Sequence, residues 1–324
     1  MKFKYLLIFI VVITCFYLIV FRKSKIIAVS ENKIVDSADC WTGASPLQIP
    51  ADSIGLLIRY GYQLITNTAK YLGPKGIVTP ITNGMNCQNC HLEAGTKPWG
   101  NNYGAVASQY PKLRARSGKI ESIEMRVNDC LQRSLNGKAI DSLSREMRAI
   151  VAYLKWLGKD IPKGQKPKGS GIEDLPFLSR AADPLKGQQY YLATCEKCHG
   201  KYGAGKPNVE DNGYIYPPLW GKNSFNDAAG LLRLSRMAGF IKNNMPFPTS
   251  YHNPALRNEV AWDIAAFIIA QPRPHKDQSQ DWPDRSKKPV DCPIGPYKDN
   301  FSEKQHKYGP FTNMHLTSNK GSTK

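Results

Sequence analysis

The sequence has no long low-complexity tract, few acidic residues, and no segment that resembles a nucleic-acid-binding module. Its 41% hydrophobic content and the missing low-complexity tract exclude a largely disordered chain. The 44 Lys and Arg residues outnumber the 26 Asp and Glu residues, which gives a net charge of +18. This excess favours an anionic partner, namely nucleic acid, anionic lipid, an acidic protein or a small anion; a basic face kept for solubility is the alternative. The length of 324 residues predicts about two domains.

Long apolar runs are also scarce, and the clearest is Tyr5–Phe21. It has about the minimum length of a membrane span, which is roughly 17 residues. Basic residues flank it on both sides, and no clean small-x-small cleavage site follows. Residues 1–25 are therefore predicted to be an export signal retained as an inner-membrane anchor, with a cleaved signal as the alternative. Cys15 lacks the small preceding residues of a lipoprotein signal. Either reading places most of the chain in the periplasm.

Two short motifs carry the strongest chemical signal, Cys87-Gln-Asn-Cys-His91 and Cys195-Glu-Lys-Cys-His199. Two cysteines three positions apart and a following histidine form the attachment signature of a c-type haem. The thiols of each pair, Cys87 with Cys90 and Cys195 with Cys198, add to the haem vinyl groups. The histidine, His91 or His199, then binds the iron as proximal ligand. A partial zinc site would explain one such motif, whereas two favour a pair of covalent haem c groups.

The apolar periodicity predicts a repeated order of helices around these motifs. One helix is expected from Ala51 to Leu72, before Gly73 and Pro74. The further predicted helices are Glu121–Leu135, Ser142–Leu157, a short one from Pro184, Asp227–Asn243 and Asn258–Ile269. The order resembles the class I cytochrome c fold twice over, an all-α fold in which the haem fills much of each small core. The predicted division is 1–25 anchor, 40–160 first domain, 161–184 linker, 185–273 second domain, and 274–324 an extended tail that wraps the domains.

The second domain offers a methionine as distal iron ligand. Met245 follows a predicted helix and precedes Pro246 in a loop, a setting that suits a ligand to an electron-transfer haem. Met237 falls inside that helix and is predicted to be core. Lys242 is near enough for a ligand exchange, which is the weaker alternative.

The first domain lacks such a methionine, because Met125 and Met147 both fall inside predicted helices. It offers Cys130 instead, which shares a helix face with Arg126 and with Ser134 and Arg133. Ile123, Val127, Leu131 and Leu135 form the adjacent apolar face. Cations lower the pKa of a thiol, and the thiolate is the form that binds iron and acts as nucleophile. A buried structural cysteine or a disulfide partner is the alternative reading of Cys130.

The cysteine count bears on that alternative. Of the eight cysteines, four belong to the haem motifs and Cys15 to the apolar run, which leaves Cys40, Cys130 and Cys292. An odd number in an oxidising compartment requires one that is free, liganded or intermolecular. A Cys40–Cys292 disulfide is a hypothesis that would leave Cys130 as the odd one.

The sequence resembles the dihaem thiosulfate dehydrogenases, which form tetrathionate and can also run as tetrathionate reductases. The resemblance rests on the Cys-x-x-Arg-Ser-x-Asn-Gly-Lys run at 130–138, on Pro217-Pro-Leu-Trp-Gly221 and on Gln305-His-Lys-Tyr-Gly-Pro-Phe311. It implies that Cys130 is the distal ligand of the first haem. The active-site residues that it further implies are Arg116, Arg126, Ser134 and Lys138. The second distal ligand varies between lysine and methionine in the family, and Met245 is expected here.

The hypothesis for the reaction combines this resemblance with charge and electron count. Joining two thiosulfates into tetrathionate releases two electrons, and two haems can take one each. The cations Arg116, Arg126 and Lys138, with Arg133, would bind the dianions. The sulfane sulfur of one thiosulfate bonds to Cys130, and a second thiosulfate then attacks that sulfur. A soluble or membrane cytochrome c is the expected redox partner.

Three other kinds of protein remain compatible with two haem motifs. The first is a membrane-anchored dihaem electron carrier, such as an oxidase subunit, without a substrate of its own. The second is a different sulfur-oxidising cytochrome, and the third is a dihaem peroxidase. A carrier would leave the run at 130–138 unexplained.

Overall fold

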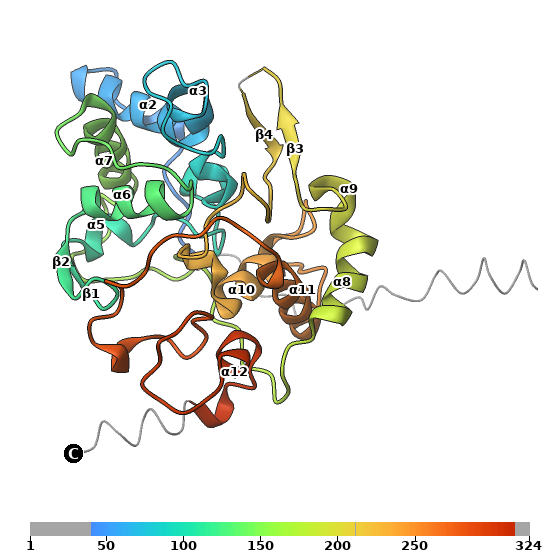
Figure 1. Ribbon diagram of the computed structural model, residues 1–324. Coiled ribbons are helices and arrows are strands. Elements are labelled where there is room, and N and C mark those ends of the chain that lie inside the picture. The colour runs from blue at the N-terminus through green and yellow to red at the C-terminus, as the bar shows by residue number, and fades with distance from the viewer. Residues whose placement is uncertain (1–39, 211, 315–324) are drawn as a thin grey trace, which may run out of the picture.

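A computed structural model describes residues 40–210 and 212–314, and this part of the chain is mostly helical (Figure 1). The helices are α2 Ser53–Thr66, α3 Thr68–Leu72, α4 Leu92–Gly95, α5 Val106–Gln109, α6 Ile123–Arg133, α7 Arg145–Leu157, α8 Pro184–Tyr190, α9 Glu196–His199, α10 Leu234–Asn244, α11 Asn258–Ala270 and α12 Glu303–Tyr308. The predicted anchor, residues 1–25, lies outside the described residues. Within the described residues, no helix has the length and hydrophobicity needed to cross a membrane.

The first helical unit, α2 to α7, is built on the packing of α2 against α7. Asp52 starts α2 by accepting a hydrogen bond from the Gly55 backbone at 2.7 Å. A Cβ on Gly61 would lie 2.0 Å from the backbone oxygen of Ala149 on α7, so only glycine permits this close approach. The predicted helix Ala51–Leu72 is divided at Asn67, which leaves the helical conformation and separates α2 from α3.

The second helical unit, α8 to α11, repeats this arrangement. Gly187 of α8 lies against the backbone of Asp263 on α11, where a Cβ would come within 1.8 Å of the carbonyl oxygen. The Asp263 side chain is buried and accepts two hydrogen bonds from Arg180, each 2.8 Å long. Its Oδ1 also accepts one from the Asp183 backbone at 2.8 Å. In each unit, therefore, a glycine allows the first long helix to pack closely against the last one.

Two further features differ from the sequence expectation. α10 begins at Leu234 rather than Asp227, because the Asp227 carboxylate binds the backbone of Lys276 at 2.9 Å and keeps its own segment out of the helix. The structure also contains two short antiparallel hairpins that an all-α fold does not have. They are β1 Lys112–Arg114 with β2 Lys119–Glu121, and β3 Lys206–Asn208 with β4 Gly213–Tyr216. Most residues of these strands are at least partly exposed. The strands therefore lack the alternating apolar pattern from which a sequence predicts a strand.

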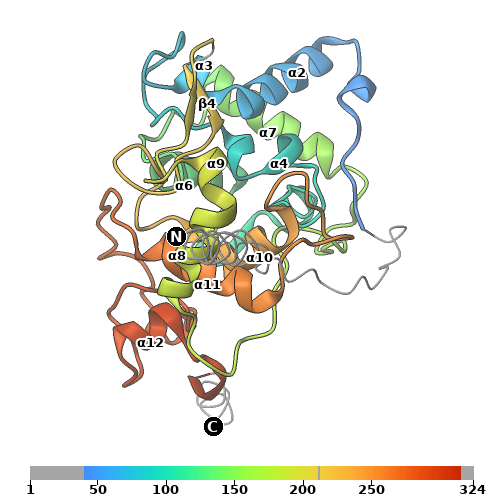
Figure 2. The same cartoon turned by 90° about the vertical axis from the view of Figure 1, so that its right-hand side faces the viewer.

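The C-terminal tail, residues 274–314, contacts both helical units. Its Trp282 backbone donates to the Arg116 carbonyl of the first unit at 2.7 Å. Its buried Asp291 accepts from Arg233 of the second unit at 2.6 Å and from the Ser235 hydroxyl at 2.5 Å. In both views α12 lies at the opposite end of the molecule from α2 and α7 (Figures 1 and 2). After α11 the tail thus first passes the loop between β1 and β2 and then reaches α12.

Candidate functional site

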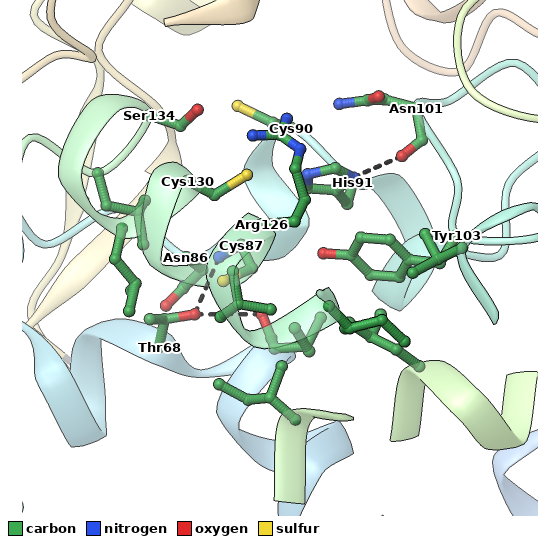
Figure 3. A pocket seen from close by; sticks show the side chains of 18 of the residues that line it. Thr68, Asn86, Cys87, Cys90, His91, Asn101, Tyr103, Arg126, Cys130 and Ser134 are labelled. Carbon is green, nitrogen blue, oxygen red and sulfur yellow. Dashed lines mark hydrogen bonds between the residues drawn. The ribbon is translucent and has the colours of Figure 1, made fainter. Parts of the chain in front are cut away.

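A cavity in the first helical unit is lined by the first Cys-x-x-Cys-His motif together with three polar residues of α6 (Figure 3). Cys87, Cys90 and His91 line it from the segment before α4. The α6 residues are Cys130, Arg126 and Ser134, the last standing at the C-terminal cap of the helix. The predicted face of α6 is therefore confirmed for these three residues, whereas Arg133, predicted to share it, does not line the cavity. The predicted apolar face, Ile123, Val127, Leu131 and Leu135, lines the same cavity.

His91 is fixed by two contacts. Its Nδ1 lies 2.5 Å from the carbonyl oxygen of Asn101, and its ring stacks on Tyr103 with centroids 4.4 Å apart. Burial lowers the pKa of His91 to about 4, so the imidazole is neutral near pH 7. A neutral ring that donates from Nδ1 leaves the Nε2 lone pair available to a metal.

The electrostatics of Cys130 differ from the sequence expectation. Burial raises the pKa of the Cys130 thiol above its ordinary value, and Arg126, Arg114 and Arg116 offset that rise only in part. Asp129 adds to the rise. The expected net lowering is therefore wrong for the protein alone, because the cost of desolvating a thiolate exceeds the attraction of the cations. A bound metal would remove this cost by taking the thiol as thiolate.

Arg126 is held beside the cavity by an acidic residue that the sequence analysis missed. Its NH1 donates to Asp129 Oδ2 at 2.6 Å, one helical turn along α6. Attraction to the thiolate form of Cys130, and after it to Asp129, raises the pKa of Arg126, so the guanidinium remains charged. The i, i+3 spacing of an arginine and an aspartate was a usable signal for this pair.

Three predicted substrate cations do not line the cavity. Arg116 donates to the Ala228 carbonyl at 2.6 Å and lies over the Trp282 ring, 5.4 Å from its centroid. The Lys138 side chain is exposed, since its segment turns away from α6 after Gly137. The Arg133 guanidinium is occupied by carboxylates of α6 and of the tail. Of the predicted cations, the structure brings Arg126 alone to the cavity wall.

A second cavity is lined by the motif Cys195, Cys198 and His199 together with Met245. The His199 Nδ1 lies 3.0 Å from the Pro217 carbonyl oxygen, which again leaves Nε2 for a metal. Met237 is buried in α10 as predicted but also lines this cavity. Lys242 does not line it, because its ammonium donates to the Leu256 carbonyl. A ligand exchange with Lys242 therefore has no support in this conformation.

The two cavities share part of their walls. Asn86 and Cys90 line both, and Gln88 and Asn89 line the second cavity from the first motif. Asn86 is buried, and its Oδ1 accepts a hydrogen bond from the Ala69 backbone at 2.8 Å. The first motif thus forms the partition between the two sites, an arrangement that the sequence did not reveal.

The other two cysteines of the described part of the chain, Cys40 and Cys292, line neither cavity. Cys40 lies beside Gly169, whereas Cys292 is buried in the tail near Lys288. Both are free thiols, so the hypothesised Cys40–Cys292 disulfide is absent. The methionines excluded as ligands behave as predicted, since Met147 is fully buried in the core and Met125 is 46% exposed.

The donor sets fit two haem c groups. Each cavity brings together two thiols, a neutral imidazole with an oriented Nε2, and one further sulfur donor. The further donors differ, a thiol from Cys130 in the first cavity and a thioether from Met245 in the second. Both cavities are otherwise lined largely by apolar side chains, as a large planar apolar group requires.

Comparison with known families and proteins agrees with these features. The family model described as SoxA/TsdA, cytochrome c domain matches residues 79–162, and the model described as cytochrome c matches residues 185–271. The chain is 39% identical over 242 residues to a thiosulfate dehydrogenase of Psychrobacter arcticus, covering 72% of this chain and 69% of that protein. It is 35% identical over 230 residues to one of Allochromatium vinosum, covering 70% and 82%.

A solved structure is also similar, that of the thiosulfate dehydrogenase TsdBA from Marichromatium purpuratum in its as-isolated form. The TM-score is 0.67 at 27% sequence identity, over 73% of this chain. The match spans half of the length of that solved chain, which therefore contains a large part without a counterpart here.

Proposed function

Since this chain belongs to the thiosulfate dehydrogenase family, with two cytochrome c domains that carry two covalent haem c groups, we propose that it joins two thiosulfate ions into tetrathionate. The reaction releases two electrons, which pass to a cytochrome-type acceptor, and the reverse reaction would make the chain a tetrathionate reductase. One observation carries the proposal: a thiol, a charged guanidinium and a haem motif line the same cavity. A plain electron carrier has no use for the first two.

Arg126 is the proposed binding residue for the sulfonate end of thiosulfate. One of its N–H groups is used by Asp129, so the remaining donors are available to sulfonate oxygens. The Ser134 hydroxyl lines the same cavity and is the proposed second donor. Together they would hold a dianion with its sulfane sulfur directed toward Cys130.

Cys130 is the proposed sulfur nucleophile and the proposed distal ligand of the first haem. Its thiolate and the sulfane sulfur of one thiosulfate form an S–S bond with the loss of two electrons. The sulfane sulfur of a second thiosulfate then attacks the new sulfur, which releases tetrathionate and restores the Cys130 thiolate. When bound, the two haems supply iron that takes Cys130 as thiolate and two one-electron acceptors.

The shared wall supports a proposed direction of electron flow. Asn86 and Cys90 line both cavities, so electrons released beside Cys130 leave through the second domain. Met245 is the proposed distal ligand there, and a thioether stabilises reduced iron more than a thiolate does. The second site would then have the higher potential and act as the exit.

The net charge of the chain and its haem attachment motifs support a proposed electron acceptor and a proposed compartment. A net charge of +18 favours an acidic redox partner, such as a soluble or membrane cytochrome c with a negative surface. The proposed location is the periplasm, where c-type haem is attached, with residues 1–25 as the proposed anchor.

A paired steady-state assay tests the function. One arm supplies thiosulfate with ferricyanide as acceptor, and the other supplies tetrathionate with a reduced electron donor. Turnover in the first arm supports the dehydrogenase, and turnover in the second alone supports the reductase direction. If neither salt reacts with protein that carries both haems, the substrate-free electron carrier becomes the better description.

A further inference from the structure

We propose that Asp281, in the C-terminal tail, is a positioning residue that holds the substrate-binding Arg126 through Arg133 and Asp129. The inference rests on the function proposed above, in which Arg126 binds the sulfonate group. If Asp281 has this role, the tail contributes to substrate binding, although Asp281 itself does not line the cavity.

The contacts begin at the cavity wall. Arg126 NH1 donates to Asp129 Oδ2 at 2.6 Å. The other oxygen of the same carboxylate, Oδ1, accepts from Arg133 Nε. Asp129 therefore joins two arginines of α6 that stand on either side of it at i−3 and i+4.

The contacts end on the tail. The two terminal nitrogens of Arg133 donate to the two oxygens of Asp281 at 2.7 and 2.8 Å, across 148 residues of sequence. The two side chains are 13% and 9% exposed, so solvent screens this pair weakly. Each of the three guanidinium nitrogens of Arg133 donates to a carboxylate, and Arg133 does not line the cavity, so it is not a proposed substrate ligand.

A second contact ties the same point of the tail to the first helical unit. Arg116 NH1 lies 3.8 Å from Asp281 Oδ2, and the Trp282 backbone donates to the Arg116 carbonyl at 2.7 Å. The position of Asp281 is thus fixed from two sides. Arg116, for which the resemblance implies an active-site role, also holds the tail in this structure.

The physical role follows from the flexibility of arginine. The Arg126 side chain is 32% exposed and would sample many rotamers if nothing held it. Asp129 restricts it, and Asp129 is itself kept in place by Arg133 and Asp281. A guanidinium ordered before substrate arrives loses less entropy on binding, so the substrate binds more tightly.

Charge and positioning predict opposite results when Asp281 is changed. Replacing Asp281 by asparagine removes a negative charge near a site for dianions, and charge alone would strengthen anion binding. Loss of positioning weakens it. The sign of the change in affinity therefore decides between the two.

The experiment is a calorimetric titration of tetrathionate into the full-length, fully oxidised protein with both haems. No electron donor is present, so no turnover occurs during the measurement. Asp281→Asn is expected to weaken binding about twofold to 30-fold, the range of effects that residues acting through a network have on a distant site. Asp284→Asn is the matched control, because it removes the same charge from an exposed tail residue whose contacts, an ion pair with Lys287 and hydrogen bonds from Ser286, stay within the tail. It should bind as tightly as the wild type or more tightly.

Further variants separate positioning from a general loss of structure. Arg133→Lys keeps the charge but replaces three separate donor nitrogens, two on Asp281 and one on Asp129, with one ammonium nitrogen, so it should weaken binding to a similar extent. The double variant should be no weaker than either single one, because both break the same connection. Asp281→Glu should restore part of the affinity. In thiosulfate turnover, Asp281→Asn should raise KM more than it lowers kcat and leave the spectra of both haems unchanged.

The outcomes are distinct. Asp281→Asn binding as tightly as Asp284→Asn, or Arg133→Lys binding like the wild type, would overturn the positioning role and leave the proposed function intact. If Asp281→Asn protein cannot be recovered with both haems, the Arg133→Lys result decides. A wild-type protein that binds no tetrathionate and oxidises no thiosulfate would overturn the proposed function, and the inference with it.

Discussion

Cys130 and His91 line one cavity from different parts of the chain. Cys130 lies in α6, and His91 is the residue directly before α4. Figure 3 shows the Cys130 sulfur pointing into the space that the His91 ring also faces. A proximal imidazole and a second sulfur donor are thus available to one iron. Substitution of Cys130 therefore tests the proposed site directly.

Cys130→Gly is expected to abolish thiosulfate turnover, because it removes both the proposed nucleophile and the proposed ligand. Both haems should remain attached, since the thioether bonds involve other cysteines. The measurements are turnover with ferricyanide and the haem-to-protein ratio. Cys40→Ser, which changes a free thiol outside both cavities, is the control and should keep wild-type turnover. Activity retained in Cys130→Gly would end the proposed mechanism.

Arg126→Lys and Lys138→Ala should respond differently to salt. Arg126→Lys keeps the charge but loses the fork of donors, which costs about 1.5–3 kcal/mol for hydrogen bonds to a charged group, or roughly tenfold to 100-fold in kcat/KM. That loss should persist at high ionic strength. Because Lys138 is exposed and does not line the cavity, it is expected to act on substrate only through long-range attraction, so its small effect should disappear as salt rises. A salt-independent loss in Lys138→Ala would show that Lys138 contacts the substrate.

Met245→Gly should change the absorption spectrum of the second haem and slow the transfer of electrons to the acceptor. The physical reason is loss of the thioether that the proposal places on that iron. Reduction of the first haem by thiosulfate should remain near the wild-type rate in a stopped-flow experiment. Met237→Leu is the comparison, because Met237 lines the same cavity from within α10. If Met237→Leu rather than Met245→Gly changes the spectrum, the ligand assignment is wrong.

Asp291→Asn should destabilise the protein at neutral pH by about 3 kcal/mol, the usual cost of breaking a buried ion pair. Asp291 is 1% exposed and pairs with Arg233 and Ser235, which hold its pKa below the ordinary value of about 3.9 despite burial. A lowered folded pKa contributes stability above that ordinary value and loses it as pH falls through the folded pKa.

Thermal unfolding as a function of pH checks this prediction. The gap in Tm between wild type and Asp291→Asn should be constant near neutrality and shrink below about pH 4. Asp174→Asn breaks a pair with Arg236 in which the aspartate is 69% exposed, so it should change stability by less than about 1 kcal/mol. An unchanged gap down to strongly acidic pH would contradict the role given to the carboxylate.

Gly61→Ala should destabilise the first helical unit by about 1–3 kcal/mol, because its Cβ would meet the backbone of α7. Chemical denaturation of the holoprotein measures the change. Gly230→Ala is the control, since a Cβ there would meet nothing within 4 Å. Equal stability of both variants would show that α2 and α7 can separate without cost.

The sequence by itself determined the parts of this protein that depend on local spacing. The Cys-x-x-Cys-His motifs, the order of helices and the shared face of Arg126, Cys130 and Ser134 all follow from positions a few residues apart. Helical periodicity also separated Met147, which is core, from Met245, which lines a cavity. These inferences held because a helix fixes the direction of each side chain without knowledge of its neighbours.

Only the tertiary structure decided which cations reach the cavity. Arg116, Arg133 and Lys138 were expected to bind substrate together with Arg126, yet the tail engages the first two and the third is exposed. Three other features could not be predicted from the sequence for the same reason. They are the two short hairpins, the wall that the two cavities share at Asn86 and Cys90, and the upward shift of the Cys130 pKa. Each depends on segments far apart in the chain and on how much water their packing removes, and neither quantity is contained in local spacing.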